Sequence, residues 1–110
     1  MEIYEVRFLQ EALEDLEEIV LYISRNNRTV AFRIHDEIIK KVNDLTVFPK
    51  RGRLVPDKKM SQAGFRMLFS HPYIIFYRVM ERCVFIYRVL HGSSNYPVLY
   101  EKILLTDGEE

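Results

Sequence analysis

Residues 73–91 read YIIFYRVMERCVFIYRVLH, two apolar runs separated only by the polar pair Glu81-Arg82. Short apolar runs bounded by polar residues are typical of strands. A two-residue connection is the spacing of a β-hairpin, although neither glutamate nor arginine is a residue that such turns favour. We therefore predict strands at Tyr73–Met80 and Cys83–His91, preceded by a third strand at Gly64–Ser70.

The sequence before these strands has the period of amphipathic helices. From Leu9 to Ile23 the apolar residues form one stripe with the glutamates outside it, and Asn26-Asn27 ends the pattern. A second helix is expected to begin after Asn27 or near Thr29 and to run to Phe48, because Pro49 stops it. Two such helices form an antiparallel hairpin whose apolar faces require a flat partner.

The remaining segments complete an α+β domain. Residues 2–8 alternate like a short strand, residues 49–57 form a loop rich in proline and basic residues, and residues 97–104 suit a short closing helix. The order is therefore β-α-α-β-β-β with a closing α, a helical hairpin packed on one face of a small antiparallel sheet. Residues 1–104 are expected to form a single domain, and residues 105–110 a short acidic tail.

The composition excludes several classes of protein. A chain of 110 residues with 48% hydrophobic residues has room for one globular domain. Its longest apolar runs have five residues, so no membrane span is expected, and its acidic start does not resemble a secretory signal. With Cys83 as the single cysteine and three scattered histidines, we expect no disulfide, no metal site, no cofactor and a cytoplasmic location.

The formal net charge of zero conceals a gradient along the chain. Residues 1–24 carry seven acidic groups and one arginine, whereas residues 25–60 carry ten basic groups and four acidic ones. A neutral total argues against a protein that binds by covering phosphates. A local basic patch remains open, and its densest segment contains Lys50, Arg51, Arg53, Lys58 and Lys59.

Several pieces, taken in order, resemble the RelE/ParE superfamily of bacterial toxins. They are LEDL at 13–16, FPKRGRLVP at 48–56, RML at 66–68, YIIFYRV at 73–79 and IYRVLHG at 86–92. The resemblance spans about residues 1–104. It implies the toxin of a type II toxin–antitoxin, or plasmid stabilisation, system, neutralised by a cognate antitoxin protein.

The superfamily has two main targets, and the sequence can be compared with both. RelE-type members cut mRNA in the ribosomal decoding site with lysines, arginines and a tyrosine at fixed places on the last strands. This chain has Phe65, Met67, Ile74 and Ser93-Ser94 where those basic residues belong, and keeps only Tyr100. Cleavage of RNA needs a proton acceptor, a proton donor and cations for the developing charge, so ribonuclease activity is not expected.

ParE-type members lack that set and act on DNA gyrase. The Gly52-Arg53 loop and the strand end at Val89–Gly92 are closer to this branch. However, Ser93-Ser94-Asn95 stands where ParE-like sequences continue with an arginine and an acidic residue. The resemblance therefore favours a ParE-like protein whose target-facing strand end is small and neutral.

Two sets of candidate site residues follow. A substituted ribonuclease site would use Arg88, His91, Tyr96 and Tyr100, with His91 as the general base unless it only caps backbone groups. A binding surface would use Arg53, Arg66, Arg78, Arg88 and His91. The arginines at 66, 78 and 88 form a cationic stripe if they share one face of the sheet, and otherwise pair with helix carboxylates or solvent.

The sequence thus predicts a ParE-like toxin that inhibits DNA gyrase by binding, without catalytic groups, and that an antitoxin silences. Two alternatives stay open at this point. One is a ribosome-dependent mRNA endonuclease with a substituted site, and the other is a family member that is not toxic. The sequence also leaves open whether the chain forms a homodimer.

Overall fold

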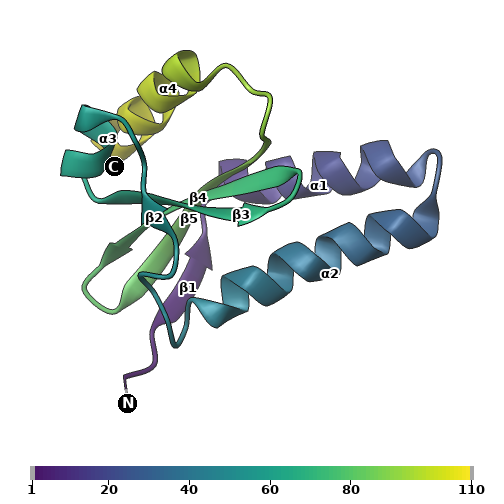
Figure 1. Cartoon of the computed structure of the whole chain (residues 1–110), viewed down its shortest axis with the longest axis horizontal. Helices are drawn as coiled ribbons and strands as arrows, with labels where there is room; N and C mark the ends of the chain where they lie inside the picture. The colour runs from purple at the N-terminus through teal and green to yellow at the C-terminus, as the bar shows by residue number, and fades with distance from the viewer. Residues whose placement is uncertain (1, 110) are drawn as a thin grey trace.

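The computed structural model describes residues 2–109 and contains a five-stranded sheet in the order β1-β5-β4-β3-β2 (Figure 1). This is the α+β fold that the sequence predicts, with two N-terminal helices on a mostly antiparallel sheet. In chain order the elements are β1 (Glu5–Phe8), α1 (Gln10–Ser24), α2 (Arg28–Asp44), β2 (Arg53–Leu54), α3 (Lys58–Gln62), β3 (Phe65–Ser70), β4 (Tyr73–Met80), β5 (Cys83–His91) and α4 (Tyr96–Glu109).

The β4–β5 hairpin forms the centre of the sheet and has the predicted strand bounds. Its tight turn places Glu81 at a φ of 58°, the positive φ that the first central residue of two-residue hairpin turns commonly adopts. Further along, Phe76 lies opposite Arg88 while Tyr77 lies opposite Ile86, so Tyr87 is an extra residue in β5. This β-bulge changes the face to which the following side chains point.

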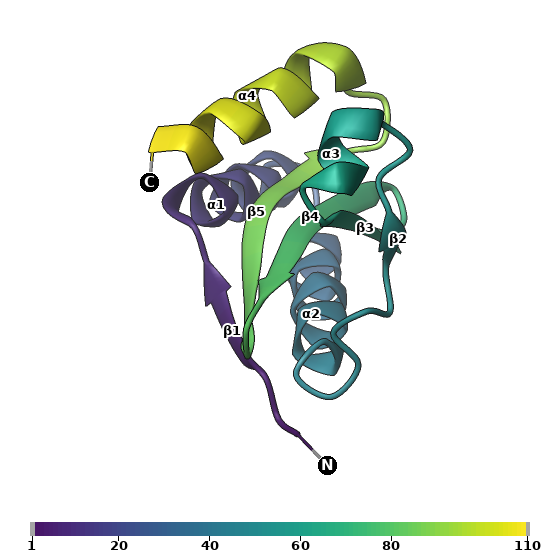
Figure 2. The same cartoon turned by 90° about the vertical axis from the view of Figure 1, so that its left-hand side faces the viewer.

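The expectation of a purely antiparallel sheet is wrong at one edge. β1 pairs parallel to β5, from Glu5 opposite Cys83 to Phe8 opposite Ile86 (Figure 2). The partners are far apart in sequence, and the alternation of residues 2–8 carries no information about which strand they join. Because β1 is four residues long and β5 is nine, the C-terminal half of β5 has no strand partner on this side.

The α1–α2 hairpin covers one face of the sheet. Asn27 caps α2 as predicted, accepting a hydrogen bond from the backbone N–H of Val30 at 3.1 Å. α2 ends at Asp44, four residues before the predicted Phe48, because the backbone N–H of Leu45 turns to the carbonyl of Val42 and the last turn tightens. The core on this face contains Ala12, Leu16, Ile34, Ile38, Val42, Leu45, Tyr73, Ile75, Tyr77, Val84, Ile86 and Val89.

The opposite face of the sheet is also buried, which the expected one-sided packing missed. α4 and α3 lie over it (Figures 1 and 2), and α4 continues to Glu109 rather than ending at Leu104. The short elements β2 and α3 fall in and just after the segment expected to be a loop. The second core contains Val55, Met60, Phe65, Met67, Ile74, Phe76, Tyr87, Leu99 and Ile103.

The loop between α2 and β2 is tied to the sheet by buried polar contacts. The backbone N–H of Gly52 donates to the hydroxyl of Tyr77 at 2.8 Å, and the guanidinium of Arg66 donates to the carbonyl of Gly52 at 2.7 Å. A Cβ at Gly52 would lie 2.6 Å from the carbonyl oxygen of Met67 and 2.8 Å from the Tyr77 ring, so no larger residue fits. The loop therefore has one defined position against the sheet.

This arrangement predicts that Tyr77→Phe destabilises the protein by about 1–3 kcal/mol, since the buried N–H of Gly52 loses its acceptor. Urea denaturation followed by circular dichroism measures the free energy of unfolding. Tyr22→Phe is the matched control, because Tyr22 is 70% exposed and its change should stay within about 0.5 kcal/mol. An equal effect of the two substitutions would contradict the proposed role of the Tyr77 hydroxyl.

Candidate functional site

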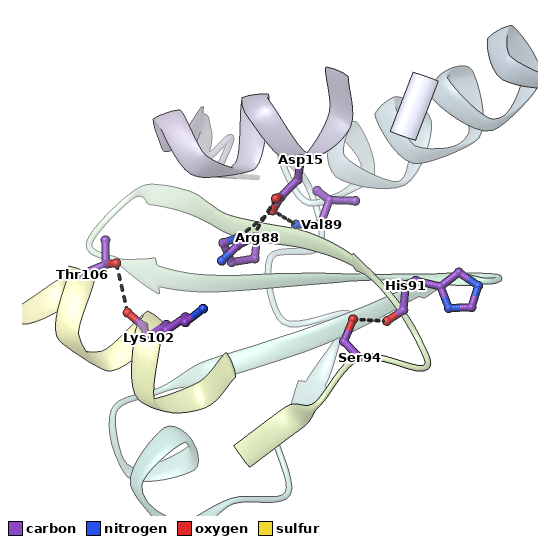
Figure 3. Close-up of polar contacts among 7 residues, drawn as sticks. All are labelled: Asp15, Arg88, Val89, His91, Ser94, Lys102 and Thr106. Carbon is purple, nitrogen blue, oxygen red and sulfur yellow. Dashed lines mark hydrogen bonds and ion pairs between the residues drawn. The ribbon is translucent and has the colours of Figure 1, made fainter. Parts of the chain in front are cut away.

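The carboxylate of Asp15, on α1, is held by three hydrogen bonds from β5. It accepts hydrogen bonds from Arg88 Nε at 2.7 Å, from Arg88 Nη2 at 2.8 Å and from the backbone N–H of Val89 at 3.0 Å (Figure 3). Asp15 therefore bonds a β5 backbone group just beyond the end of β1, where no strand reaches. It joins α1 to β5 through one side chain.

This ion pair determines what Arg88 can do. The hydrogen bonds that Arg88 donates to Asp15 raise the pKa of Arg88 above its usual value, although burial lowers it, and the charges of Asp15, Glu11 and Glu18 raise it further. The Arg88 side chain is 25% exposed and its fork is occupied by one carboxylate. Arg88 is therefore a structural cation, bound to a helix carboxylate, and not a free group for a phosphate.

His91 lies exposed at the end of β5. Its Nδ1 accepts a hydrogen bond from the backbone N–H of Ser93 at 3.1 Å and lies 2.8 Å from the Ser93 hydroxyl. The edge of the Tyr73 ring meets the imidazole with 5.7 Å between ring centroids. With Nδ1 accepting from the Ser93 N–H, the proton of the neutral ring belongs on Nε2, which is then a hydrogen-bond donor.

Tyr96 and Tyr100, the two other candidates for catalysis, lie together on α4. Their rings stack with centroids 6.0 Å apart, and the Tyr96 hydroxyl donates to the carbonyl of Gly92. Burial raises the pKa of Tyr100, the charges of Tyr96 and Asp57 add to this, and Arg53 opposes it. The Tyr100 hydroxyl thus keeps its proton at neutral pH, which removes it as a general base.

Arg66 and Arg78 do not share a surface. Arg66 pairs with Tyr77 across the strands and Arg78 pairs with Phe65, so their side chains leave opposite faces of the sheet. Arg66 reaches the loop carbonyl of Gly52. Arg78 donates to the Tyr87 hydroxyl at 3.0 Å and lies over the Phe65 ring at 4.8 Å.

The condition for a cationic stripe, that Arg66, Arg78 and Arg88 share one face of the sheet, is therefore not met. The bulge at Tyr87 and the alternation of faces send the three side chains to three different neighbours. The last of the binding candidates, Arg53, is exposed on β2 and lies 5.7 Å from the centre of the Phe69 ring. In the contacts described above, no two of these four arginines share a partner.

The end of the sheet near His91 is hollowed on two sides. A groove of about 500 Å³ lies between α1 and the end of β5. A smaller hollow of about 350 Å³ lies at the β3–β4 turn, and His91 borders both. The α1–β5 groove is lined by Asp15, Glu18, Ile19, Leu21, Tyr22, Arg25, Tyr73, Val89, Leu90 and His91.

Two kinds of site are not found among residues 2–109. No group of three or more potential metal-binding side chains comes together in this part of the chain. None of the described helices is both long and apolar enough to cross a membrane.

Comparisons with known proteins agree with this fold. Residues 6–96 match the family model described as the ParE toxin of the type II toxin–antitoxin system parDE. This is most of the chain. The chain belongs to the ParE toxin family.

Two solved structures show the same fold. One, described as the chromosomal ParDE toxin–antitoxin system from P. aeruginosa, is 20% identical, with a TM-score of 0.66, over 81% of this chain and 96% of that one. The other, the toxin–antitoxin complex RelBE2 from Mycobacterium tuberculosis, is 25% identical, with a TM-score of 0.62, over 81% and 98%. No curated protein matches the sequence.

The family assignment confirms the predicted membership of the RelE/ParE superfamily and its ParE branch. The residue that sequence reasoning missed is Asp15, which enters the sequence analysis only as one of the seven acidic groups of residues 1–24. A signal was present, because Asp15 is three residues after Ala12 and four before Ile19, on the apolar stripe itself. A carboxylate at that position must find a buried partner.

Asp15→Asn tests this contact in the ParE-family toxin. The substitution keeps the shape but removes the hydrogen-bonded counter-ion of the half-buried Arg88 charge, so we expect a loss of about 3 kcal/mol in the free energy of unfolding. Chemical denaturation is the measurement. Glu5→Gln is the control, because its ion pair with Arg7 is about 60% exposed on both sides and should contribute less than about 1 kcal/mol. Equal losses would show that the Asp15–Arg88 ion pair stabilises the fold no more than the exposed Glu5–Arg7 pair does.

Proposed function

We propose that this ParE-family toxin inhibits DNA gyrase by binding to it and that a cognate antitoxin silences it. The observation that carries the proposal is the engagement of Arg88 by Asp15, which removes the central cation from any site for RNA cleavage. An inhibitor that only occupies a protein surface needs no catalytic group. The proposal therefore accounts for a fold that keeps the family architecture without a converging acid, base and cation.

The other candidates for catalysis support the same conclusion. His91 presents a donor nitrogen, Tyr96 is bonded to the carbonyl of Gly92, and burial raises the pKa of Tyr100. In-line attack by a 2′-hydroxyl needs a base at the attacking oxygen and an acid at the leaving oxygen. These residues offer neither in the arrangement observed.

The antitoxin is proposed to occupy the α1–β5 groove. Leu21 and Tyr22 at its rim are 54% and 70% exposed, and the neighbouring edge of β5 has no strand partner beyond Ile86. Large exposed apolar side chains beside a groove are typical of protein interfaces. Both solved structures described above come from toxin–antitoxin systems, which supports a partner of this kind for the present chain.

The first test measures the target. The purified chain is expected to block supercoiling by gyrase and to leave translated mRNA uncut in a primer-extension assay. Tyr100→Phe should leave the supercoiling block unchanged, because the hydroxyl has no role in binding the target. Cleavage of mRNA at ribosomal A-site codons that disappears in Tyr100→Phe would establish the endonuclease alternative, and normal growth on expression would indicate a non-toxic member.

The second test concerns the antitoxin. In co-expression with the protein encoded by the neighbouring reading frame, Tyr22→Glu should weaken the complex at least tenfold, since it places a charge in an apolar contact. Isothermal titration calorimetry gives the affinity. Phe32→Glu is the matched control, because Phe32 is 59% exposed on α2 and does not line the groove. An unchanged affinity for Tyr22→Glu would show that the antitoxin binds a surface other than the α1–β5 groove.

A further inference from the structure

A third hollow lies at the opposite end of the sheet from His91. We call it the basic pocket, and it has a volume of about 600 Å³. Phe48 at its wall is 60% exposed. The lining residues are Tyr4, Val47, Phe48, Pro49, Lys50 and Arg51.

The charges that line the basic pocket are both positive. Arg51 pairs with Asp44 at 3.2 Å, and the nearby carboxylate of Glu2 pairs with Arg82 at 3.2 Å. Lys50 is exposed, and none of the carboxylates whose side chains the structure describes, in residues 2–106, pairs with its ammonium group. The pocket therefore combines an apolar wall with a cation that has no internal counter-ion.

The loop that forms the basic pocket is held in one conformation before any partner arrives. The backbone N–H of Phe48 donates to the backbone carbonyl of Asp44 at 2.9 Å. The backbone N–H of Arg51 donates to the carbonyl of Phe48 at 3.1 Å. The contacts of Gly52 with Tyr77 and Arg66 fix the end of the loop. A surface ordered in advance loses less entropy on binding, which favours affinity.

The basic pocket is separate from the α1–β5 groove. Since β1 runs parallel to β5 and Glu5 pairs with Cys83, Tyr4 lies beside the start of β5, whereas His91 is its last residue. Eight residues of extended strand correspond to about 26 Å. Figure 1 shows the end of α2 meeting the start of β1 at one end, with the α1–α2 turn at the far end.

We propose that the basic pocket is the surface through which the toxin engages gyrase. It would take an acidic segment of that protein, with an apolar side chain packed against Phe48 and a carboxylate facing Lys50. The positive lining and the exposed aromatic wall select this chemistry, because aromatic residues and arginine carry much of the binding energy at protein interfaces. The inference rests on the proposed gyrase target and assigns it a site distinct from the α1–β5 groove.

The test compares two variants with matched controls in the full chain. Phe48→Glu and Lys50→Glu are compared with Phe32→Glu and Lys40→Glu, since Phe32 and Phe48 are 59% and 60% exposed and both lysines are exposed. The readout is the toxin concentration that half-inhibits supercoiling. We expect it to rise at least tenfold for Phe48→Glu, to rise severalfold for Lys50→Glu and to stay unchanged for the controls.

Two further measurements separate the possible outcomes. Antitoxin affinity and the midpoint of thermal unfolding should be unchanged in both pocket variants, because the substituted side chains are exposed and distant from the groove. If the unsubstituted toxin inhibits gyrase and both pocket variants inhibit it equally well, the basic pocket is not the target site, although the proposed function stands. If the unsubstituted toxin does not inhibit gyrase at all, both proposals fail. Loss of antitoxin binding in Phe48→Glu would assign the basic pocket to the antitoxin and overturn the inference.

Discussion

The contact on which the arrangement of the N-terminal half depends is the one between Asp15 and the end of β5. β1 is too short to cover β5, so the Val89 N–H would lie at an open edge beneath α1. The carboxylate of Asp15 accepts hydrogen bonds from that N–H and from the guanidinium of Arg88 together. One side chain thus satisfies a backbone donor, neutralises a half-buried cation and fixes α1 over the sheet, and these effects depend on one another because they share two oxygen atoms.

The central strands were predictable from the sequence, but the second layer of helices that packs on them was not predicted. Residues 73–77 are all buried, and their run of five apolar residues is what a strand covered on both faces shows. The sequence-based prediction packs this strand against one helical hairpin only. Its composition already implied a second cover, which α4 and α3 supply. The bounds of β4 and β5 followed from local sequence because polar residues terminate both runs.

What sequence alone could not give are the relations between distant segments. The parallel pairing of β1 with β5 joins residues about eighty positions apart, and alternation within residues 2–8 is the same for any partner. The face of Arg88 depends on one extra residue, Tyr87, since a bulge reverses the alternation after it. The membership of the ParE family was accessible because it rests on the order of several motifs, which does not require the side-chain positions to be known.

The arginines of the sheet stabilise the fold, whereas the loop between α2 and β2 exposes a positive charge at the surface. Arg66 bonds a loop carbonyl, Arg78 stacks on Phe65, and Arg88 is held by Asp15, so each of the three contributes to the fold rather than to a surface. Lys50 keeps its charge at the surface beside an exposed phenylalanine. A chain with a formal charge of zero can therefore still present a local cation to a protein partner, without the broad positive surface that a nucleic acid would require.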